Sequence, residues 1–341
     1  MSVFEGAGLS RRGFLIGAGG VAAMAALTAC GSSDQPAAAA PSGPWEFTDD
    51  RGEKAARPQR PAKVVAYVSS AAALWEYGIK PIGVFGPQKT ADGGKELQAG
   101  NIDLNAVTSI GNAWDDFSLE KFAALQPDLV ITGLTGAKPT DLWVLTDELG
   151  PKVQKIAPIV ALSEYKQTLP KVIERYSQLA ASLGADVNTD AQKTAKADFD
   201  KASEELRAAA KEKAGLKVLV VYSDKDNFYV ARPEFFADLA YYRELGLDIV
   251  SGAGGPTDYW ETLSWEQAGK YPADLILTDV RTFALPRAEM AKFPTWNQLP
   301  AVKANQLGDW SAEPRFSHQL ATPVIQKLTA LVKAARTDIV A

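Results

Sequence analysis

Residues 117–120, Phe-Ser-Leu-Glu, and residues 126–132, Gln-Pro-Asp-Leu-Val-Ile-Thr, recur later in the chain. The second copy reads Leu-Ser-Trp-Glu at residues 263–266 and Pro-Ala-Asp-Leu-Ile-Leu-Thr at residues 272–278, and the two copies align without gaps. In each copy the serine can cap a short helix, and the Asp-Leu-aliphatic-aliphatic-Thr run is typical of a buried parallel strand. The repeat therefore predicts two lobes of related topology.

A second, looser repeat supports this prediction. Glu-Tyr-Gly-Ile at residues 76–79 matches Glu-Leu-Gly-Leu at residues 244–247, and each indicates a helix that a glycine closes before the chain becomes extended again. Strand-like apolar runs such as residues 64–68 and 218–222 alternate with helical segments. This alternation predicts an α/β fold with two Rossmann-like lobes and central, mostly parallel sheets. Ligands of such lobes bind beyond the carboxyl ends of the strands.

A helical segment of residues 168–214 separates the two copies. Its second half carries one apolar stripe at spacings of three and four, which consists of Ala195, Phe199, Ala202, Leu206 and Ala209. We expect one helix over residues 189–213, roughly 36 Å long at 1.5 Å per residue. That length is enough to cross both lobes as a stiff strut. The alternative is an ordinary surface helix within one lobe.

The first residues contain export features. Ser-Arg-Arg-Gly-Phe-Leu at residues 10–15 resembles a twin-arginine signal, and Leu-Thr-Ala-Cys at residues 27–30 resembles a bacterial lipobox. We therefore expect residues 1–29 to be removed and Cys30 to carry lipid. The apolar run between the two motifs is too short to span roughly 30 Å of hydrocarbon comfortably, which disfavours a transmembrane anchor. Residues 30–44 are rich in Ala, Ser, Gly and Pro and predict a flexible tether.

The remaining chain then divides into an N-terminal lobe (residues 45–167), a helical linker (168–214) and a C-terminal lobe (215–341). Cys30 and His318 are the only cysteine and histidine, so Cys/His zinc sites and the usual Ser or Cys triads are disfavoured. The net charge of −5, with scattered Lys and Arg, argues against nucleic acid as a partner.

Two other classes of protein fit the sequence less well. A surface-anchored hydrolase could use carboxylate pairs, but acids so close together in loops are usually turn residues. These pairs are Asp115 with Asp116 and Asp224 with Asp226. A cell-wall adhesion or scaffold module would explain the lipid anchor, yet it would not need two matched lobes and a strut.

Further motifs indicate a particular protein family. Trp45-Glu-Phe-Thr-Asp-Asp-Arg-Gly52, Arg60-Pro-Ala-Lys-Val-Val65 and Leu299-Pro-Ala-Val-Lys-Ala304 occur in order with the lipobox, the repeats and the connecting helix. The chain resembles the substrate-binding lipoproteins of iron-siderophore ABC importers, whose relatives also carry haem or cobalamin. The resemblance implies two lobes joined by one long helix, a ligand captured between them, no catalysis and no cofactor. It further implies a monomer on the outer face of the cytoplasmic membrane that serves a permease and its ATPase.

In that family a glutamate on each lobe docks onto the permease, and the matching positions are Glu120 and Glu266. Each is expected in the first turn of its repeat helix, projecting from the lobe surface. Charge pairs on both lobes would orient the complex and speed encounter more than they add affinity. The alternative is that each glutamate only completes a capping box with Ser118 or Ser264.

The ligand cleft of such a protein should be lined by aromatic and cationic side chains beyond the strand ends. Trp265 replaces Leu119 of the first repeat, so we expect it in the core, and Trp296 should anchor a surface segment. A second group of aromatics is Tyr67, Phe85, Tyr222 and Tyr229. The expected ligand-binding residues are Trp114, Trp143, Tyr229, Arg232, Tyr259, Trp260, Arg281, Trp310 and Arg315.

Guanidinium and indole groups suit a ferric chelate with negatively polarised oxygens around the iron. The chelator would hold the iron, so the resemblance requires no protein metal ligand. Hydroxamate-binding relatives commonly have an arginine in the loop that corresponds to residues 112–114, and this chain has none there. The chemical class of the siderophore therefore stays open. His318, a possible haem ligand, is expected to be structural.

Overall fold

The computed structural model describes residues 43–340, so the signal, the lipobox and Cys30 lie outside the described residues. The first lobe is built on a five-stranded sheet in the order β5-β4-β3-β6-β7, and all its strand pairs are parallel. The strands are β3 (Val64–Tyr67), β4 (Gly83–Phe85), β5 (Thr108–Ser109), β6 (Leu129–Leu134) and β7 (Ile159–Ser163).

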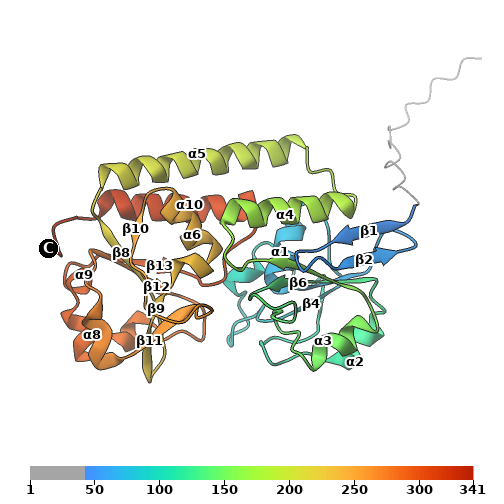
Figure 1. Ribbon diagram of the computed structural model, residues 1–341, viewed down its shortest axis with the longest axis horizontal. Coiled ribbons are helices and arrows are strands. Elements are labelled where there is room, and N and C mark those ends of the chain that lie inside the picture. The colour runs from blue at the N-terminus through green and yellow to red at the C-terminus, as the bar shows by residue number, and fades with distance from the viewer. Residues whose placement is uncertain (1–42, 341) are drawn as a thin grey trace, which may run out of the picture. The chain divides into compact units, whose positions relative to one another are not determined.

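Helices cover both faces of this sheet, with α1 and α4 on one side and α2 and α3 on the other (Figure 1). Strands β3 and β6 are buried along their whole length, which explains their continuous apolar sequences. The helices are α1 (Val68–Glu76), the 3₁₀ turn η1 (Leu97–Ala99), α2 (Leu119–Ala124), α3 (Leu149–Gln154) and α4 (Leu169–Ser182).

The second lobe has a six-stranded mixed sheet. Strands β10, β8, β12 and β13 are parallel neighbours, and the antiparallel strands β9 and β11 extend the sheet beside β8. Strands β8 (Lys217–Ser223), β9 (Asn227–Ala231), β10 (Asp248–Ile249), β11 (Trp260–Ser264), β12 (Leu275–Asp279) and β13 (Leu307–Trp310) form this sheet. Its helical segments are η2 (Pro233–Phe235), α6 (Ala237–Glu244), η3 (Trp265–Lys270), α7 (Arg287–Met290), α8 (Pro294–Gln298), α9 (Pro300–Lys303) and α10 (His318–Ala334).

The sequence repeat corresponds to a structural repeat. Strand β6 pairs in parallel with β3, and its counterpart β12 pairs in parallel with β8, the first strand of the second lobe. Strands β4 and β10, which follow the matched glycines Gly78 and Gly246, pair with β3 and β8 in the same way. Both glycines have positive φ values of 82° and 101°, where glycine is favoured. The predicted fold class is confirmed, and the antiparallel β9–β11 extension is an addition that the repeat did not predict.

Helix α5 (Asp190–Glu212) extends over both lobes (Figure 1). Thr189 caps its first turn by accepting a hydrogen bond from the Gln192 backbone N–H, and the helix ends three residues before Gly215. Its buried stripe includes Phe199, Ala202 and Leu206, as predicted. The helix packs along the C-terminal helix α10.

The chain also crosses back between the lobes after β13. The Tyr67 hydroxyl, at the end of β3, donates a hydrogen bond of 2.8 Å to Glu313 Oε2. Phe316 stacks on Tyr176 of α4, with ring centroids 5.6 Å apart. The segment that precedes α10 therefore seals the lobe junction, which no local sequence pattern indicated.

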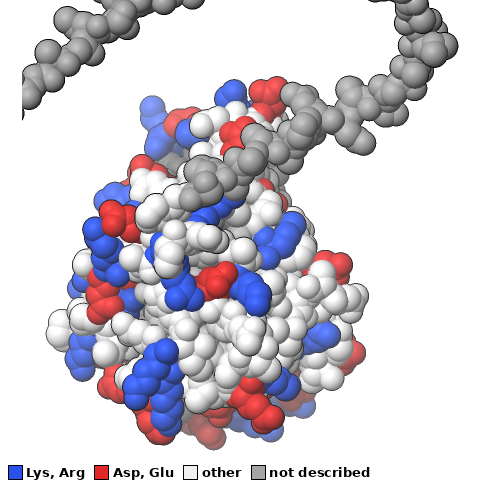
Figure 2. Space-filling model, turned by 90° about the vertical axis from the view of Figure 1, so that its right-hand side faces the viewer, with Lys and Arg blue, Asp and Glu red and all other residues white. Residues whose placement is uncertain are grey.

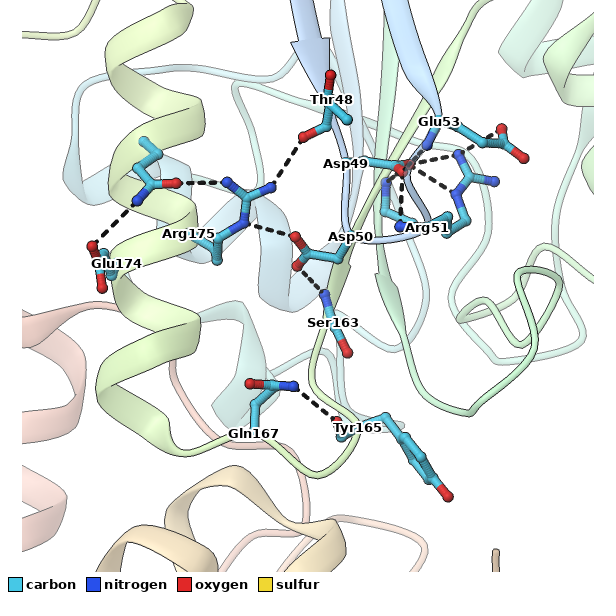
Figure 3. Close-up of polar contacts among 12 residues, drawn as sticks. Thr48, Asp49, Asp50, Arg51, Glu53, Ser163, Tyr165, Gln167, Glu174 and Arg175 are labelled. Carbon is cyan, nitrogen blue, oxygen red and sulfur yellow. Dashed lines mark hydrogen bonds and ion pairs between the residues drawn. The ribbon is translucent and has the colours of Figure 1, made fainter.

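Strands β1 (Trp45–Thr48) and β2 (Lys54–Arg57) form a separate antiparallel hairpin. Two adjacent acids at its turn attach it to the first lobe (Figure 3). Asp49 accepts a 2.9 Å bond from the Ala161 backbone N–H. Asp50 accepts bonds of 2.7 Å from the Ser163 backbone N–H and from Arg175 Nε.

We expect Asp50→Ala to lower the free energy of unfolding by about 1.5 kcal/mol, because it leaves the Arg175 and Ser163 donors without their acceptor. Urea denaturation would measure this change. Glu46→Ala is the matched control, since Glu46 pairs with Lys54 on the same hairpin while both side chains are 66% and 56% exposed. That control should cost less than about 0.5 kcal/mol. Equal losses in the two variants would contradict the proposed anchoring role.

Within residues 43–340 no helix has the length and apolar character that a bilayer crossing requires. Lys and Arg side chains intermingle with Asp and Glu on the face of the first lobe in Figure 2. This face therefore has no extended patch of a single charge sign.

Candidate ligand-binding cleft

A cavity of about 370 Å³ lies between the lobes. Part of its wall comes from residues that follow the carboxyl ends of β6, β7, β12 and β13, the position where ligands bind in open α/β sheets. The rest comes from the segment after β9 and from the start of β11. The lining residues are Thr135, Trp143, Glu164, Phe235, Phe236, Ala237, Tyr259, Trp260, Arg281, Ala312 and Pro314.

Trp143 is fixed by contacts from the first lobe. Its backbone N–H donates to the Gly133 carbonyl at 3.1 Å, and its carbonyl accepts from Thr132 Oγ1 at 3.1 Å. Its ring stacks on Tyr67 with centroids 5.4 Å apart and an interplanar angle of 5°. The indole is thus held in one orientation at the cavity.

Glu164 follows β7 directly and accepts a 3.2 Å hydrogen bond from Trp143 Nε1 through Oε2. Its other carboxylate oxygen, Oε1, is buried and has no hydrogen-bond partner. A Cβ at Gly133 would collide with Oε1, so a larger residue there would displace this carboxylate. Burial raises the pKa of Glu164 to about 8.

The second lobe supplies an aromatic wall. Trp260 begins β11 and is backed by Phe236 and Trp310, with centroids 4.9 and 5.9 Å away. The neighbouring Tyr259 hydroxyl donates a hydrogen bond across the lobes to the Thr135 carbonyl. Tyr259 and Trp260 also line an open hollow of about 520 Å³ beside β9. The predicted aromatics Trp143, Tyr259 and Trp260 therefore come together.

Two of the three predicted cations are paired within the protein. Arg281 lines the cavity, but its guanidinium contacts Asp279 at 2.6 Å and Glu313 at 3.5 Å. Arg232 contacts Glu234 at 2.9 Å and the Asp258 carbonyl at 3.0 Å. Each of these two guanidinium groups therefore has a carboxylate partner in the protein.

Two predicted residues lie away from the cavity. Trp310 is only 4% exposed, and its Nε1 donates a 2.8 Å bond to the buried Asp238 carboxylate, so it belongs to the interior and supports Trp260 from behind. Arg315 lines separate hollows of about 710 and 390 Å³. Neither residue lines the cavity, so their contact with ligand stays a prediction.

Trp114 and Tyr229 lie near the lobe junction without lining the cavity. Trp114 packs edge-on against Phe283 of the other lobe at 4.6 Å, and its Nε1 is buried without a partner. Tyr229 stacks on Tyr222 at 4.9 Å and lines the open hollow beside β9. As expected, Trp265 is in the core, 5% exposed, and Trp296 is buried at 2%.

The sequence reasoning missed several lining residues. Glu164 is the clearest omission from the predicted ligand-binding residues. It directly follows the apolar run of residues 159–163 and so lies at a strand end. Phe235 and Phe236 follow β9, whose antiparallel pairing no repeat indicated. The signal that could have found Glu164 is the apolar run of residues 159–163, which predicts a buried strand with Glu164 as the next residue.

Glu120 and Glu266 are both exposed, in the first turns of α2 and η3. The Ser264 capping box uses Gln267, and Ser118 accepts a hydrogen bond from the Lys121 backbone N–H. The alternative that the glutamates complete these boxes is therefore wrong, because they stand one position too early. A hydrogen bond from Ser264 lowers the pKa of Glu266.

The other candidate groups have structural partners. His318 opens α10 and packs on Phe199 at 5.1 Å. Asp224 accepts hydrogen bonds from the backbone N–H groups of Asp226 and Asn227 and thereby shapes a turn. In the described part of the chain, no group of three or more His, Cys, Asp and Glu side chains is placed to hold a metal ion.

Two α/β lobes with a cavity between their strand ends define a bilobal binding protein. The chain belongs to the periplasmic binding protein family, which matches residues 65–314.

Individual relatives agree with this assignment. The structure is similar to that of DesE, a ferric-siderophore receptor protein from Streptomyces coelicolor, with 40% identity and a TM-score of 0.81 over 86% of this chain and 99% of that chain. The Fe(3+)-citrate-binding protein YfmC of Bacillus subtilis is 24% identical over 72% of this chain and 71% of its own length. The putative ABC transporter substrate-binding lipoprotein YhfQ of Bacillus subtilis is 26% identical over 72% and 75%.

Proposed function

We propose that this protein is the extracytoplasmic substrate-binding component of an ABC importer and captures a ferric siderophore between its lobes. One observation carries the proposal. The cavity at the lobe junction is lined by Trp143, Tyr259 and Trp260 in a chain that shares 40% identity with a ferric-siderophore receptor. Aromatic faces suit the apolar periphery of such a chelate, whose own oxygens hold the iron.

The remaining parts of the proposal concern the membrane. Residues 1–29 act as an export signal, Cys30 carries lipid, and residues 30–44 tether the protein to the outer face of the cytoplasmic membrane. The N-terminal lobe (45–167), linker (168–214) and C-terminal lobe (215–341) act as one monomer, and Glu120 and Glu266 dock onto the permease. The name of the lipoprotein YhfQ supports the anchor. The exposure of both glutamates supports the docking role.

A haem or cobalamin ligand is the alternative within the same class of transporter. His318 packs on Phe199 instead of lining the cavity, which disfavours a haem held by this histidine.

A ligand panel tests the proposed function. Iron-loaded hydroxamates, catecholates and citrate, with haem and cobalamin, would each be added to the protein during thermal unfolding. A ligand at 100 times its Kd should add about 2.7 kcal/mol of stability and raise the midpoint. The expected result is stabilisation by at least one ferric siderophore but not by its iron-free form. Stabilisation by haem or cobalamin alone would overturn the siderophore proposal.

A further inference from the structure

A hollow of about 710 Å³, called the α10 hollow below, lies beside helix α10 and the edge strand β13 of the second lobe (Figure 1). It is distinct from the inter-lobe cavity. Along the segment after β13, Ala312 lines the inter-lobe cavity, whereas Ser311, Glu313 and Arg315 line the α10 hollow, and Pro314 borders both. A molecule in the α10 hollow would therefore leave the inter-lobe cavity free.

The walls of the α10 hollow are largely apolar. Helix α10 contributes Val324, Leu328 and Leu331, and strands β12 and β13 contribute Leu277 and Leu307. Pockets for small molecules combine such apolar walls with a few polar groups that orient the ligand. The walls therefore suit a ligand with an apolar chain.

Two of the lining side chains are apolar and exposed to solvent. Leu97 of the first lobe is 40% exposed, and Val280 of the second lobe is 38% exposed. Only four large apolar side chains of the described chain are exposed in this way. Apolar groups that gather on a surface mark interaction sites. The α10 hollow is thus open to solvent beside an apolar surface that a ligand could cover.

Arg315 supplies a positive charge without a partner. Its side chain is half-buried and makes no ion pair or hydrogen bond with any described residue. Burial lowers its pKa, because only the phenol of Tyr242 lies near enough to oppose the loss of hydration, yet a guanidinium stays charged. An anion beside it would compensate that loss. Lys327, also at the hollow, is exposed and has no ion-pair partner among the described residues.

The acids that line the α10 hollow are already engaged. Asp309 forms an ion pair with Arg287 at 2.5 Å, and Asp238 accepts a 2.8 Å hydrogen bond from Trp310. Glu313 takes part in the contacts with the first lobe described above. Burial raises the pKa of both Asp238 and Glu313 to about 7, so each carries less than a full charge at neutral pH. The unpaired charge at the hollow is therefore positive.

We propose that the α10 hollow binds a long-chain monocarboxylate, whose alkyl chain lies along α10 and whose carboxylate contacts Arg315. The lining part of α10 from Ala321 to Leu331 is about 15 Å long at 1.5 Å per residue, so a chain of about twelve carbons would extend along it. Because the α10 hollow is distinct from the inter-lobe cavity, this inference does not depend on the proposed transport function.

A series of simple amphiphiles tests the proposal. Octanoate, decanoate and dodecanoate would be titrated into the full chain by calorimetry, each below its critical micelle concentration. The affinity should rise by about fourfold for each added CH₂ group. Dodecanol and dodecyltrimethylammonium have the same chain without the carboxylate, and each should bind at least about tenfold more weakly than dodecanoate.

Two pairs of variants separate the head group from the chain. Arg315→Gln should weaken dodecanoate about tenfold and leave dodecanol unchanged, whereas Arg243→Gln, on an exposed arginine of α6 outside the hollow, should change neither. Val280→Asp should weaken both amphiphiles, because it places a charge beside the alkyl chain. Ile156→Asp is its control, since Ile156 is 37% exposed and lies outside the hollow.

The wild-type series decides the proposal even if a variant folds poorly. Affinity that does not depend on chain length, or equal affinity for dodecanoate, dodecanol and dodecyltrimethylammonium, would overturn it. Unchanged binding of dodecanoate to a folded Arg315→Gln protein would do the same. Binding to phosphatidylglycerol vesicles without binding of free dodecanoate would assign the hollow to a membrane surface instead. Dimerisation that Val280→Asp abolishes would assign it to a second copy of the chain, and both results would refute the carboxylate site.

Discussion

Cells that carry the double variant Glu120→Ala, Glu266→Ala should lose uptake of the ferric chelate, while the purified variant keeps its affinity within about twofold. The two side chains are exposed on α2 and η3, one on each lobe, and neither lines the cavity. Helix α8, which packs on η3, and helix α2 lie on the side of the molecule away from α5 (Figure 1). A permease that contacts both lobes on that side would be oriented by the two charges. Uptake of radioactive iron and fluorescence titration would measure the two quantities.

The control for this experiment removes two equivalent charges from the opposite side. Glu205 and Glu212 are exposed on α5, and neither has an ion-pair partner among the described residues. Replacing both with alanine changes the net charge by the same amount and should leave uptake unchanged. Normal uptake in the Glu120/Glu266 variant, or a matching loss of ligand affinity, would refute the docking role.

Trp260→Ala should weaken binding of the ferric chelate by about 30-fold, which corresponds to about 2 kcal/mol for a buried aromatic anchor. Trp260 lines both the cavity and the adjoining hollow, and Phe236 and Trp310 hold its ring from behind. Truncation would leave a void that this rigid wall cannot fill. Trp260→Phe keeps an apolar face and should lose less affinity. Quenching of tryptophan fluorescence at micromolar chelate would measure both, and the quench itself should shrink in Trp260→Phe.

Trp75→Ala is the matched control for this substitution. Trp75 is a half-buried tryptophan of α1 with the Lys80 ammonium over its ring at 3.7 Å, and it lies outside the cavity lining. Both substitutions should lower folding stability, but only the loss of Trp260 should lower affinity. Equal affinities for the two alanine variants would show that Trp260 supports the fold without contacting the ligand.

Local patterns in the chain were sufficient to predict the two lobes and the long helix between them. The aligned copies of residues 117–132 and 263–278 indicated two lobes because a buried parallel strand needs a continuous apolar run wherever it occurs. The stripe on α5 and its Thr189 cap gave its limits to within a residue. Trp143, Tyr259 and Trp260 were found because the repeat located the strand that precedes Trp143 and the segment that begins shortly after Tyr259 and Trp260.

The charge of the cavity was decided by tertiary structure alone. Arg281 and Arg315 both follow strands near the predicted cleft, and no sequence pattern distinguishes them. In the structure Arg281 pairs with Asp279 and Glu313 at the cavity, whereas Arg315 lines separate hollows. Trp310 turned inward because the distant Asp238 accepts its N–H group. Partners such as Glu313 and Tyr67 are far apart along the chain and meet only when the last segment returns across the lobes. Periodicity and capping depend on residues that are close together in the chain, so the sequence alone determined the two lobes and helix α5. Pairing of buried charges depends on contacts between distant segments, so only the folded protein could assign the cavity its electrostatic character.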